Sequence, residues 1–376
     1  MSSGSERRLE ARSARRRSGR RLPERPPDPA ALVEPAPPSF PRHPTEDARV
    51  DDFLTGRFGR GAGGTSVVPL SGDASTRRYY RLVRGGETTV LALYPEPFEP
   101  DTLPFLIVRK LMAGWGLPVP RVLDVEGPLG VVVQEDLGDL TLQEALRGAG
   151  AARRTELYRQ ALDQLVVLQR EAARASQRAG CFQIAFDFEK LSWELHFFWK
   201  HFLEAYRKRD LSVEDRAMIA DGFHRLCAEI ASWPRVLTHR DFHSRNLMCH
   251  QGALYWIDFQ DARMGPATYD LASLLRDSYM DFSEQQVEAL IAFFLARRNA
   301  SKADDADFRR RFDLMALQRN LKALGTFGYQ TIWRGNTVYI QYIPRTLNYV
   351  RANLERYARF GRLRELLAAH LEELRQ

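Results

Sequence analysis

The chain has few cysteines, and none of them are close enough in sequence to act as a pair. Its three cysteines, Cys181, Cys227 and Cys249, lie far apart, and no CxxC motif occurs in the 376 residues. A disulfide framework and a zinc ribbon are therefore not indicated, and this cysteine usage fits a reducing cytosol. We expect a cytoplasmic protein.

Long apolar runs are missing as well. A membrane-spanning helix takes about 18 or more apolar residues, and the longest candidate, near Ala289 to Ala296, is far shorter. The first residues lack the apolar segment of a secretory signal, although an Arg-rich, Ser-containing leader is also compatible with a transit peptide. We expect no membrane span. With 44% hydrophobic and 27% charged residues, the composition is that of a globular protein with one or two domains.

Excess positive charge is found at one end of the chain only. The net charge is +7, but residues 1–26 alone carry +6 and the remainder +1. Nine of the 20 prolines fall between Pro23 and Pro44, and this polar stretch cannot bury enough surface to offset its ordering entropy. We interpret residues 1–46 as a disordered Arg- and Pro-rich tail. It is expected to contact anionic surfaces only loosely, with no specific nucleic-acid partner.

Residues 47–136 show mostly β-strand patterns. The runs TRRYYRLV and ETTVLALY flank Gly85-Gly86, which predicts a tight hairpin, and TSVVPL precedes them. An amphipathic helix is expected from Leu103 to Ala113, followed by strands near Val119 to Val125 and Gly130 to Gln134. The segment therefore predicts a small antiparallel sheet with one helix.

Residues 137–376 are mainly helical in pattern. The apolar period of 3.6 predicts helices at 151–178, 187–208, 212–232, 283–299, 303–325 and 338–375. Only two short strand-like runs, at 236–238 and 253–257, interrupt them. The sequence thus predicts an α+β protein with a β-rich lobe and a larger helical lobe, and a cleft between the two lobes.

The two short strands flank the segment richest in chemistry, VLTHRDFHSRNLMCHQGALYWIDFQDA. Asp241 is followed by Asn246 and then by Asp258, which comes directly after an apolar strand. Phosphoryl transfer from a nucleotide requires one carboxylate beside the acceptor hydroxyl, and an amide with a second carboxylate on Mg²⁺. These residues supply that set. The alternative is that they only satisfy the backbone of a turn.

This segment resembles the protein-kinase-like superfamily, in which H-x-D-x-x-x-x-N marks the catalytic loop. The resemblance implies a two-lobed kinase fold over most of residues 51–376, with ATP and Mg²⁺ as cofactors. It makes Asp241 the catalytic base and Asn246 and Asp258 the metal ligands. It also makes His239 a structural member of the loop and Asp270 the helix residue that tethers the loop backbone.

The same resemblance assigns nucleotide contacts to the small lobe. Gly72, Ser75 and Thr76, in SGDASTRRYY, occupy the loop that lies over the phosphates in kinases. The run Gln134 to Gly138 has the hinge position, where adenine is expected to bond to the backbone of Glu135 and Leu137. An ordinary hairpin loop and an ordinary linker turn are the respective alternatives.

One departure from the kinase pattern is clear. The third strand carries no lysine, and residues 103–113 contain no glutamate to pair with one. Either other cations meet the phosphates, or the protein is a catalytically inactive scaffold with a basic tail. Strand alternation puts Arg77 and Arg81 on one face and Arg78 on the other, so either face is a source of guanidinium groups. We assign Arg78 to the nucleotide.

The lysine-free strand, THRDFHSRNLM and IDFQDARMGPATYDLASLLRDSYM together resemble the aminoglycoside-phosphotransferase-type kinases of N-acetylmuramate and N-acetylglucosamine. That resemblance implies phosphorylation of the anomeric C1 hydroxyl of an amino sugar in peptidoglycan recycling. His243, Arg245 and Asp261 are the expected acceptor contacts. An aminoglycoside or a choline-like alcohol is the alternative acceptor, although cationic acceptors call for acidic residues around Asp241, where the sequence is mixed or basic.

A zinc site formed by His239, His243 and His250 is a further alternative, because histidines four residues apart can face one metal. It lacks a helical frame and a clear fourth ligand.

Overall fold

The computed structural model describes residues 44–59, 64–70, 76–299 and 302–375. The chain divides into two compact units, Met1–Ala48 and Arg49–Gln376, and the fold below is that of the second. Most of the tail lies outside the described residues. The proposed division at residue 136, inside the second unit, stays a prediction. No helix in the described part of the chain is both long and apolar enough to cross a membrane.

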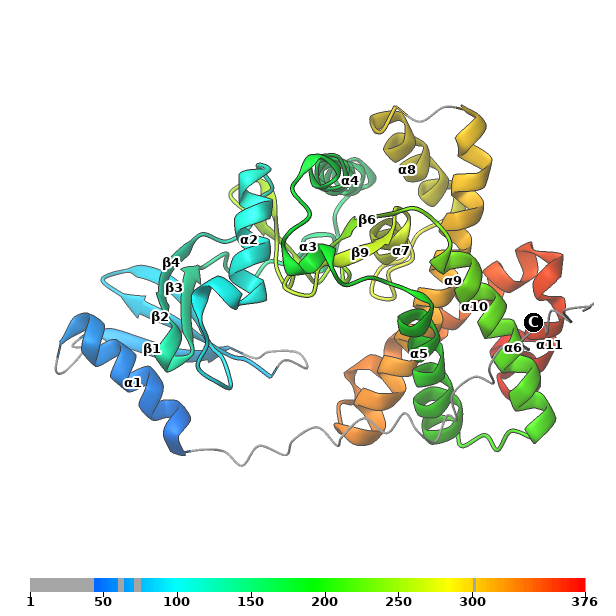
Figure 1. Ribbon diagram of the computed structural model, residues 1–376, viewed down its shortest axis with the longest axis horizontal. Coiled ribbons are helices and arrows are strands. Elements are labelled where there is room, and N and C mark those ends of the chain that lie inside the picture. Colours follow the sequence, from blue (N-terminus) through cyan, green and yellow to red (C-terminus); the bar gives the residue numbers. More distant parts are fainter. Residues whose placement is uncertain (1–43, 60–63, 71–75, 300–301, 376) are drawn as a thin grey trace, which may run out of the picture. The chain divides into compact units, whose positions relative to one another are not determined.

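The predicted small antiparallel sheet is confirmed (Figure 1). Its strands are β1 (Thr65–Leu70), β2 (Arg78–Arg84), β3 (Glu87–Leu93), β4 (Val122–Glu126) and β5 (Val131–Glu135), in the order β1-β2-β3-β5-β4. Gly85 and Gly86, at φ +58° and +86°, form the β2–β3 turn. Positive φ at both positions suits glycine and matches the turn to the twist of the strands.

A helix that the sequence did not predict covers one face of this sheet. Helix α1 (Pro44–Phe58) begins within the last residues of the segment assigned to the tail, and the boundary at residue 46 stays a prediction. Val50, Phe53 and Leu54 of α1 share a small core with Leu91, Val133 and other residues of the sheet. Their i, i+3, i+4 spacing is helical, but the few apolar positions of this segment stand among charged residues, which concealed the pattern.

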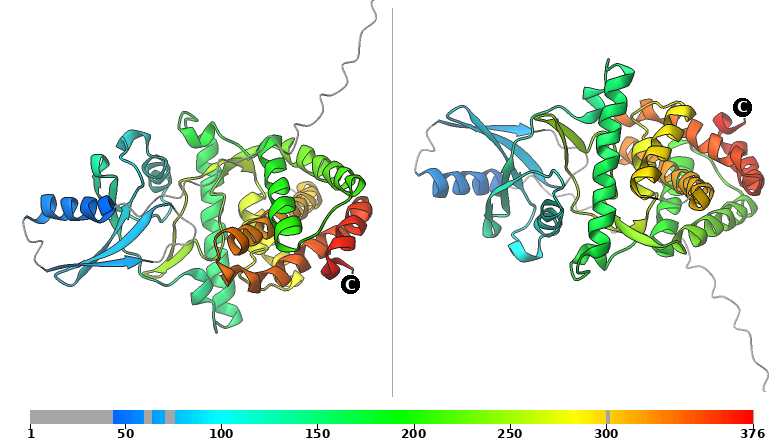
Figure 2. Two further views of the ribbon diagram at one scale, coloured as in Figure 1. Left: turned by 90° about the horizontal axis from the view of Figure 1, so that it is seen from below. Right: turned by 90° about the horizontal axis from the view of Figure 1, so that it is seen from above.

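The other face of the sheet joins the main hydrophobic core. Val132 of β5 packs there with Val108 and Met112 of α2 (Pro104–Gly114). The remaining chain is largely helical, as predicted, with α4 as the long green helix of Figure 2. The helices are α3 (Leu142–Ala145), α4 (Ala151–Arg174), α5 (Phe188–Phe198), a π-helix η5 (Trp199–Tyr206), α6 (Val213–Ala231), α7 (Tyr269–Leu275), α8 (Glu284–Arg297) and α9 (Lys302–Trp333).

The C-terminal segment differs from the single helix predicted for 338–375. It consists of η6 (Thr337–Tyr342), α10 (Ile343–Arg356), η7 (Ala358–Phe360), α11 (Gly361–His370) and η8 (Glu372–Leu374). The break follows Arg356, where Tyr357 takes extended dihedral angles of φ −122° and ψ 111°. Apolar periodicity continues across that break, because both helices bury leucines in the same core. A periodic pattern alone therefore could not reveal the break.

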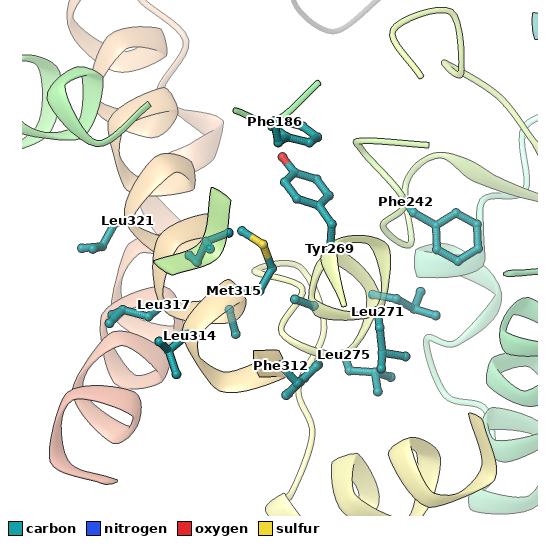
Figure 3. Close-up of a cluster of buried hydrophobic side chains, with 14 of the residues drawn as sticks. Phe186, Phe242, Tyr269, Leu271, Leu275, Phe312, Leu314, Met315, Leu317 and Leu321 are labelled. Carbon is teal, nitrogen blue, oxygen red and sulfur yellow. The ribbon is translucent and has the colours of Figure 1, made fainter. Parts of the chain in front are cut away.

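Two short antiparallel ribbons interrupt the helices. Strand β6 (Arg235–Thr238) pairs with β9 (Arg263–Pro266), and β7 (Leu247–His250) pairs with β8 (Ala253–Trp256). Figure 3 shows part of the core close to them, where Phe186 stacks on Tyr269 of α7 with ring centroids 3.9 Å apart. The segment between β6 and β7 is the predicted catalytic loop, and Asp258 follows β8.

Helix α9 packs backbone to backbone against α5 and η5. A Cβ atom at Gly325 would lie 2.7 Å from the Cα of Phe198, and one at Gly328 would lie 2.3 Å from the carbonyl oxygen of His201. Both distances are shorter than van der Waals contact. The two glycines therefore let α9 approach its neighbours closely and fix its position along them.

We expect Gly328→Ala to lower the free energy of unfolding by about 1–3 kcal/mol, because the new methyl group overpacks a backbone contact. Gly56→Ala is the control: this exposed glycine of α1 has open space around it, and alanine is favoured there by roughly 0.5–1 kcal/mol. Urea titrations of both variants measure the two effects. Equal stability of the two variants would contradict the close approach.

Candidate active site

The catalytic loop is held by a buried carboxylate from α7. The backbone N–H groups of His239 and Arg240 donate to the two oxygens of Asp270, at 2.7 and 3.0 Å. Arg240 has φ +85°, a conformation that costs a non-glycine residue roughly 1–3 kcal/mol. The two charge-assisted bonds offset that cost. Burial raises the pKa of Asp270 to about 7, although the backbone bonds and Arg319 act to lower it.

Two further side chains that the sequence analysis missed also hold the loop. Arg319 of α9 donates to the carbonyl oxygen of Arg240 at 2.9 Å. Asp277 accepts from the backbone N–H and the hydroxyl of Ser244, at 2.9 and 2.6 Å. Asp277 lies two residues after the end of α7, so no helical spacing pointed to it. Arg319 had no local signal.

Asp241, Asn246 and Asp258 are linked through backbone bonds. The Asn246 amide Nδ2 donates to the Asp241 carbonyl at 2.9 Å, and the Ile257 N–H donates to the Asn246 carbonyl at 3.1 Å. Asp258 has φ +62°, and its Oδ1 accepts from Gln260 Nε2 at 2.8 Å. The loop and the turn after β8 are therefore joined at the position next to Asp258.

His239 is a buried neighbour of both aspartates. Its Nε2 lies 3.0 Å from the Ile257 carbonyl oxygen. Burial lowers its pKa to about 4, although the charges of Asp258 and Asp241 act to raise it. The imidazole is therefore neutral near pH 7, and its position agrees with a structural part in the loop.

Asp241 is surrounded by positive charge. Lys322 Nζ of α9 lies 3.3 Å from Asp241 Oδ1, and Arg240 Nε lies 3.6 Å from Oδ2. Burial acts to raise the pKa of Asp241, but the charges of Lys322, Arg240 and Arg319 outweigh it, so that the pKa lies well below its usual value. Asp241 is a carboxylate at neutral pH.

The arginines at the start of β2 differ in what they contact. Arg77 Nη2 lies 3.1 Å from Asp258 Oδ1, the predicted metal ligand. Arg78, which we assigned to the nucleotide, is exposed. Arg81 binds two carboxylates of the segment after β5: Nε and Nη2 lie 2.6 and 3.1 Å from Asp136, and Nη1 and Nη2 lie 3.0 and 2.8 Å from Asp139. Arg81 therefore holds the segment that the sequence predicts as the hinge.

The remaining predicted nucleotide contacts are only partly described. Gly72 and Ser75 lie outside the described residues, and Thr76 is exposed. The Glu135 N–H donates to the Arg121 carbonyl at 2.8 Å, so an adenine bond at Glu135 would use another backbone group. The Leu137 carbonyl lies 3.2 Å from His250 Nδ1.

The predicted acceptor contacts separate into two groups. Arg245 lies over the ring of Tyr279, with its guanidinium carbon 4.9 Å from the ring centroid, and the His243 ring lies 5.3 Å from the same tyrosine. Asp261 accepts from Arg240 Nη1 at 2.6 Å. Asp261 is thus already bound to Arg240 of the loop, whereas His243 and Arg245 both contact the ring of Tyr279.

The zinc alternative is not supported. Within the described ranges, no three His, Cys, Asp or Glu side chains gather as a metal site would require. His239 and His250 instead face the carbonyls of Ile257 and Leu137.

The fold is that of the protein-kinase-like phosphotransferases, as solved structures indicate. A choline/ethanolamine kinase family protein from Mesorhizobium loti aligns with a TM-score of 0.55 at 16% identity, covering 88% of this chain and 99% of that one. The ADP-bound aminoglycoside phosphotransferase APH(2'')-Ib aligns with a TM-score of 0.53 at 14% identity, covering 81% and 97%. Identities this low support the fold alone.

The chain belongs to the phosphotransferase enzyme family, whose model matches residues 66–310. The N-acetylmuramate/N-acetylglucosamine kinase of Neisseria meningitidis serogroup B is 34% identical over 78% of this chain and 87% of its own length. The enzyme of that name from Pseudomonas aeruginosa is 33% identical over 81% and 88%. The predicted family is confirmed, and the protein is a kinase that phosphorylates an alcohol group.

The two carboxylates bound by Arg81 provide a matched test of the hinge. The Asp136 side chain is 5% exposed and that of Asp139 is 80% exposed. We expect Asp136→Asn to lower the free energy of unfolding by about 2 kcal/mol, because it removes a charge-assisted bond in a buried place. Asp139→Asn should cost less than about 1 kcal/mol. Urea titrations at pH 7 compare the two, and equal losses would contradict the assignment.

The Asp136 effect should also depend on pH. Burial acts to raise the pKa of Asp136, but its bonds to Arg81 and Gly138 prevail and lower it. A lowered pKa stabilises the fold above the unfolded-state value of about 3.9, and that contribution is lost as the pH falls below it. The difference between wild type and Asp136→Asn should therefore narrow as the pH falls from about 4 to about 2. A constant difference would show that the ion pair is not its source.

Proposed function

We propose that this chain transfers the γ-phosphoryl group of ATP, with Mg²⁺, to the anomeric C1 hydroxyl of an amino sugar. N-acetylmuramate and N-acetylglucosamine are the favoured acceptors, and cell-wall recycling in the cytoplasm is the favoured setting. The proposal is supported by the names of relatives matched over most of their length. The observation that carries it is the loop in which Asp270 and Arg319 fix the backbone next to Asp241.

In this proposal Asp241 orients the acceptor hydroxyl and takes its proton. The transition state of phosphoryl transfer is loose, so the proton leaves late and a strong base is not required. A carboxylate with a lowered pKa suits that part, because it remains ionised while the hydroxyl is positioned. His239, neutral and buried, supports the loop without exchanging protons.

Asn246 and Asp258 are suited to hold Mg²⁺. The Asn246 Nδ2 is engaged by the Asp241 carbonyl, which leaves the amide oxygen as the ligand atom. The Asp258 side chain is 43% exposed, and both residues offer the hard oxygen donors that Mg²⁺ prefers. Mg²⁺ bound there would neutralise charge on the phosphates.

Arg77 is the best candidate for the cation that replaces the strand lysine. It reaches Asp258 from the start of β2, so its guanidinium lies where phosphates coordinated by a metal on Asp258 would be. Arg81 is unsuited, because it binds Asp136 and Asp139. Gly72, Ser75, Thr76 and the backbone of Glu135 and Leu137 remain our proposed nucleotide contacts.

The charge around Asp241 argues against cationic acceptors such as aminoglycosides or choline. Burial lowers the pKa of Lys190 of α5, and the positive charges of Arg240, Arg263 and Lys322 lower it further, although Glu194 acts to raise it. These cations therefore lie close together near the base. A neutral or anionic sugar is more compatible with these positive charges than an amine. His243, Arg245 and Asp261 remain the proposed sugar contacts.

The decisive experiment offers ATP, Mg²⁺ and a panel of alcohols to the purified protein and to its Asp241→Asn variant. We expect the wild-type protein to phosphorylate N-acetylmuramate or N-acetylglucosamine. The product should have no reducing end, as phosphorylation at C1 requires. Asp241→Asn should lower kcat by about 10² to 10⁴, the usual contribution of a positioned base. Preference for an aminoglycoside or choline would refute the sugar assignment, and turnover by Asp241→Asn near the wild-type rate would refute the assigned base.

Arg77 and Arg78 form a second matched test. We expect Arg77→Met to raise the KM for ATP about tenfold or more, because a charge-assisted contact to phosphate is lost. Arg78→Met should change it by less than about threefold, since Arg78 is exposed whereas Arg77 contacts Asp258. Steady-state kinetics at saturating sugar measures both. A larger effect of Arg78→Met would favour the assignment made from the sequence.

A further inference from the structure

A lysine from a distant part of the chain lies against the proposed base. Lys322 of α9 follows Asp241 by 81 residues, and its Nζ lies 3.3 Å from Asp241 Oδ1. The two side chains are 19% and 23% exposed. The contact is therefore neither a solvated surface pair nor a fully buried one. It involves a carboxylate oxygen of Asp241, the group expected to contact the acceptor hydroxyl.

The position of Lys322 is fixed from both sides along α9. One turn before it, Arg319 donates to the Arg240 carbonyl at 2.9 Å. One turn after it, Gly325 packs against the backbone of Phe198. Because residues three apart lie on neighbouring parts of one helix face, the structure that holds the loop also brings Lys322 to Asp241.

Stability does not explain this lysine. Removing both charges from water costs solvation free energy that offsets their attraction, and ordering a long side chain costs rotamer entropy. The backbone of the loop is already held by Asp270, Asp277 and Arg319. A cation beside the proposed base is better explained by a part in the reaction, because it can stabilise negative charge on the triphosphate.

The two cations at Asp241 differ in what they can do. Arg240 has a rigid guanidinium that also binds Asp261 at 2.6 Å. Lys322 has three donors on a flexible stem. The acceptor oxygen must lie about 3 Å from Asp241, and the phosphorus about 3–3.5 Å from that oxygen. An ammonium beside Oδ1 can therefore contact both the carboxylate and the phosphoryl group.

We propose that Lys322 is a catalytic residue that bridges Asp241 and the transferring phosphoryl group and stabilises its negative charge. This rests on the proposed function. The acceptor oxygen forms a bond to the γ-phosphorus, the bond from phosphorus to the β–γ bridging oxygen breaks, and ADP leaves with that electron pair. The hydroxyl proton passes to Asp241. Lys322 keeps its own proton and donates hydrogen bonds throughout.

Three substitutions test the proposal: Lys322→Met, which keeps the stem without the charge, Lys322→Arg, which keeps the charge, and the control Lys200→Met, at an exposed lysine of η5. We expect Lys322→Met to lower kcat by about 10² to 10³, as loss of a transition-state donor does, with the KM for ATP changed less than threefold. Lys322→Arg should recover at least tenfold over the Met variant, and Lys200→Met should match wild type.

Thermal melts accompany these assays, and rates are compared about 15 °C below the lowest Tm so that every variant is folded. A kcat of Lys322→Met within threefold of wild type, or a change confined to the KM of the sugar, would overturn the inference. So would an arginine variant no faster than the methionine variant. If the Lys322 variants give one of these results but Asp241→Asn is inactive in the same assay, the proposed function still stands. An active Asp241→Asn would remove the basis for both the proposed function and the role of Lys322.

Discussion

The site depends on one interaction, the pair of hydrogen bonds from His239 and Arg240 N–H groups to Asp270. Arg240 is held at φ +85°, and without a buried acceptor this backbone would relax to a more common conformation at a gain of roughly 1–3 kcal/mol. Relaxation would turn Asp241 away from Asn246 and Lys322. A carboxylate whose pKa burial raises to about 7 is itself costly. The hydrogen bonds that fix the loop therefore come with a cost in folding free energy.

The strand arginines have definite carboxylate partners in a sheet that lacks the usual kinase lysine. Arginines of one strand face have separate partners: Arg77 reaches Asp258, and Arg81 holds the segment after β5 through Asp136 and Asp139. A guanidinium can bind two carboxylates at once because it is a planar fork. Arg81 uses that geometry fully, which ties the sheet to the linker that follows it. Arg77 contacts Asp258, the predicted metal ligand, and lies over the rings of Tyr79 and Tyr94.

The sequence predicted the parts of the fold that depend on local spacing. The strands around Gly85 and Gly86 follow from short-range patterns, and the fold class was correct. The Asp241, Asn246 and Asp258 set rests on the same kind of spacing and stays a prediction. Contacts made by α9 could not be predicted, because Arg319 and Lys322 look like any charged residues on a helix until tertiary packing brings them to the loop. Helix α1 was missed for a related reason. Its few apolar residues can be recognised as a buried face only when they are seen packed against the sheet.

Helix α9 connects packing with chemistry. Arg319 and Lys322 face the loop, while Gly325 and Gly328 remove the side chains that would hold α9 away from Phe198 and His201. A shift of one residue along the helix rotates each side chain by about 100°, since the helix has 3.6 residues per turn. Such a shift would direct Lys322 away from Asp241 and place a Cβ atom against a neighbouring backbone. The same close contact that stabilises the core therefore determines which charge faces Asp241.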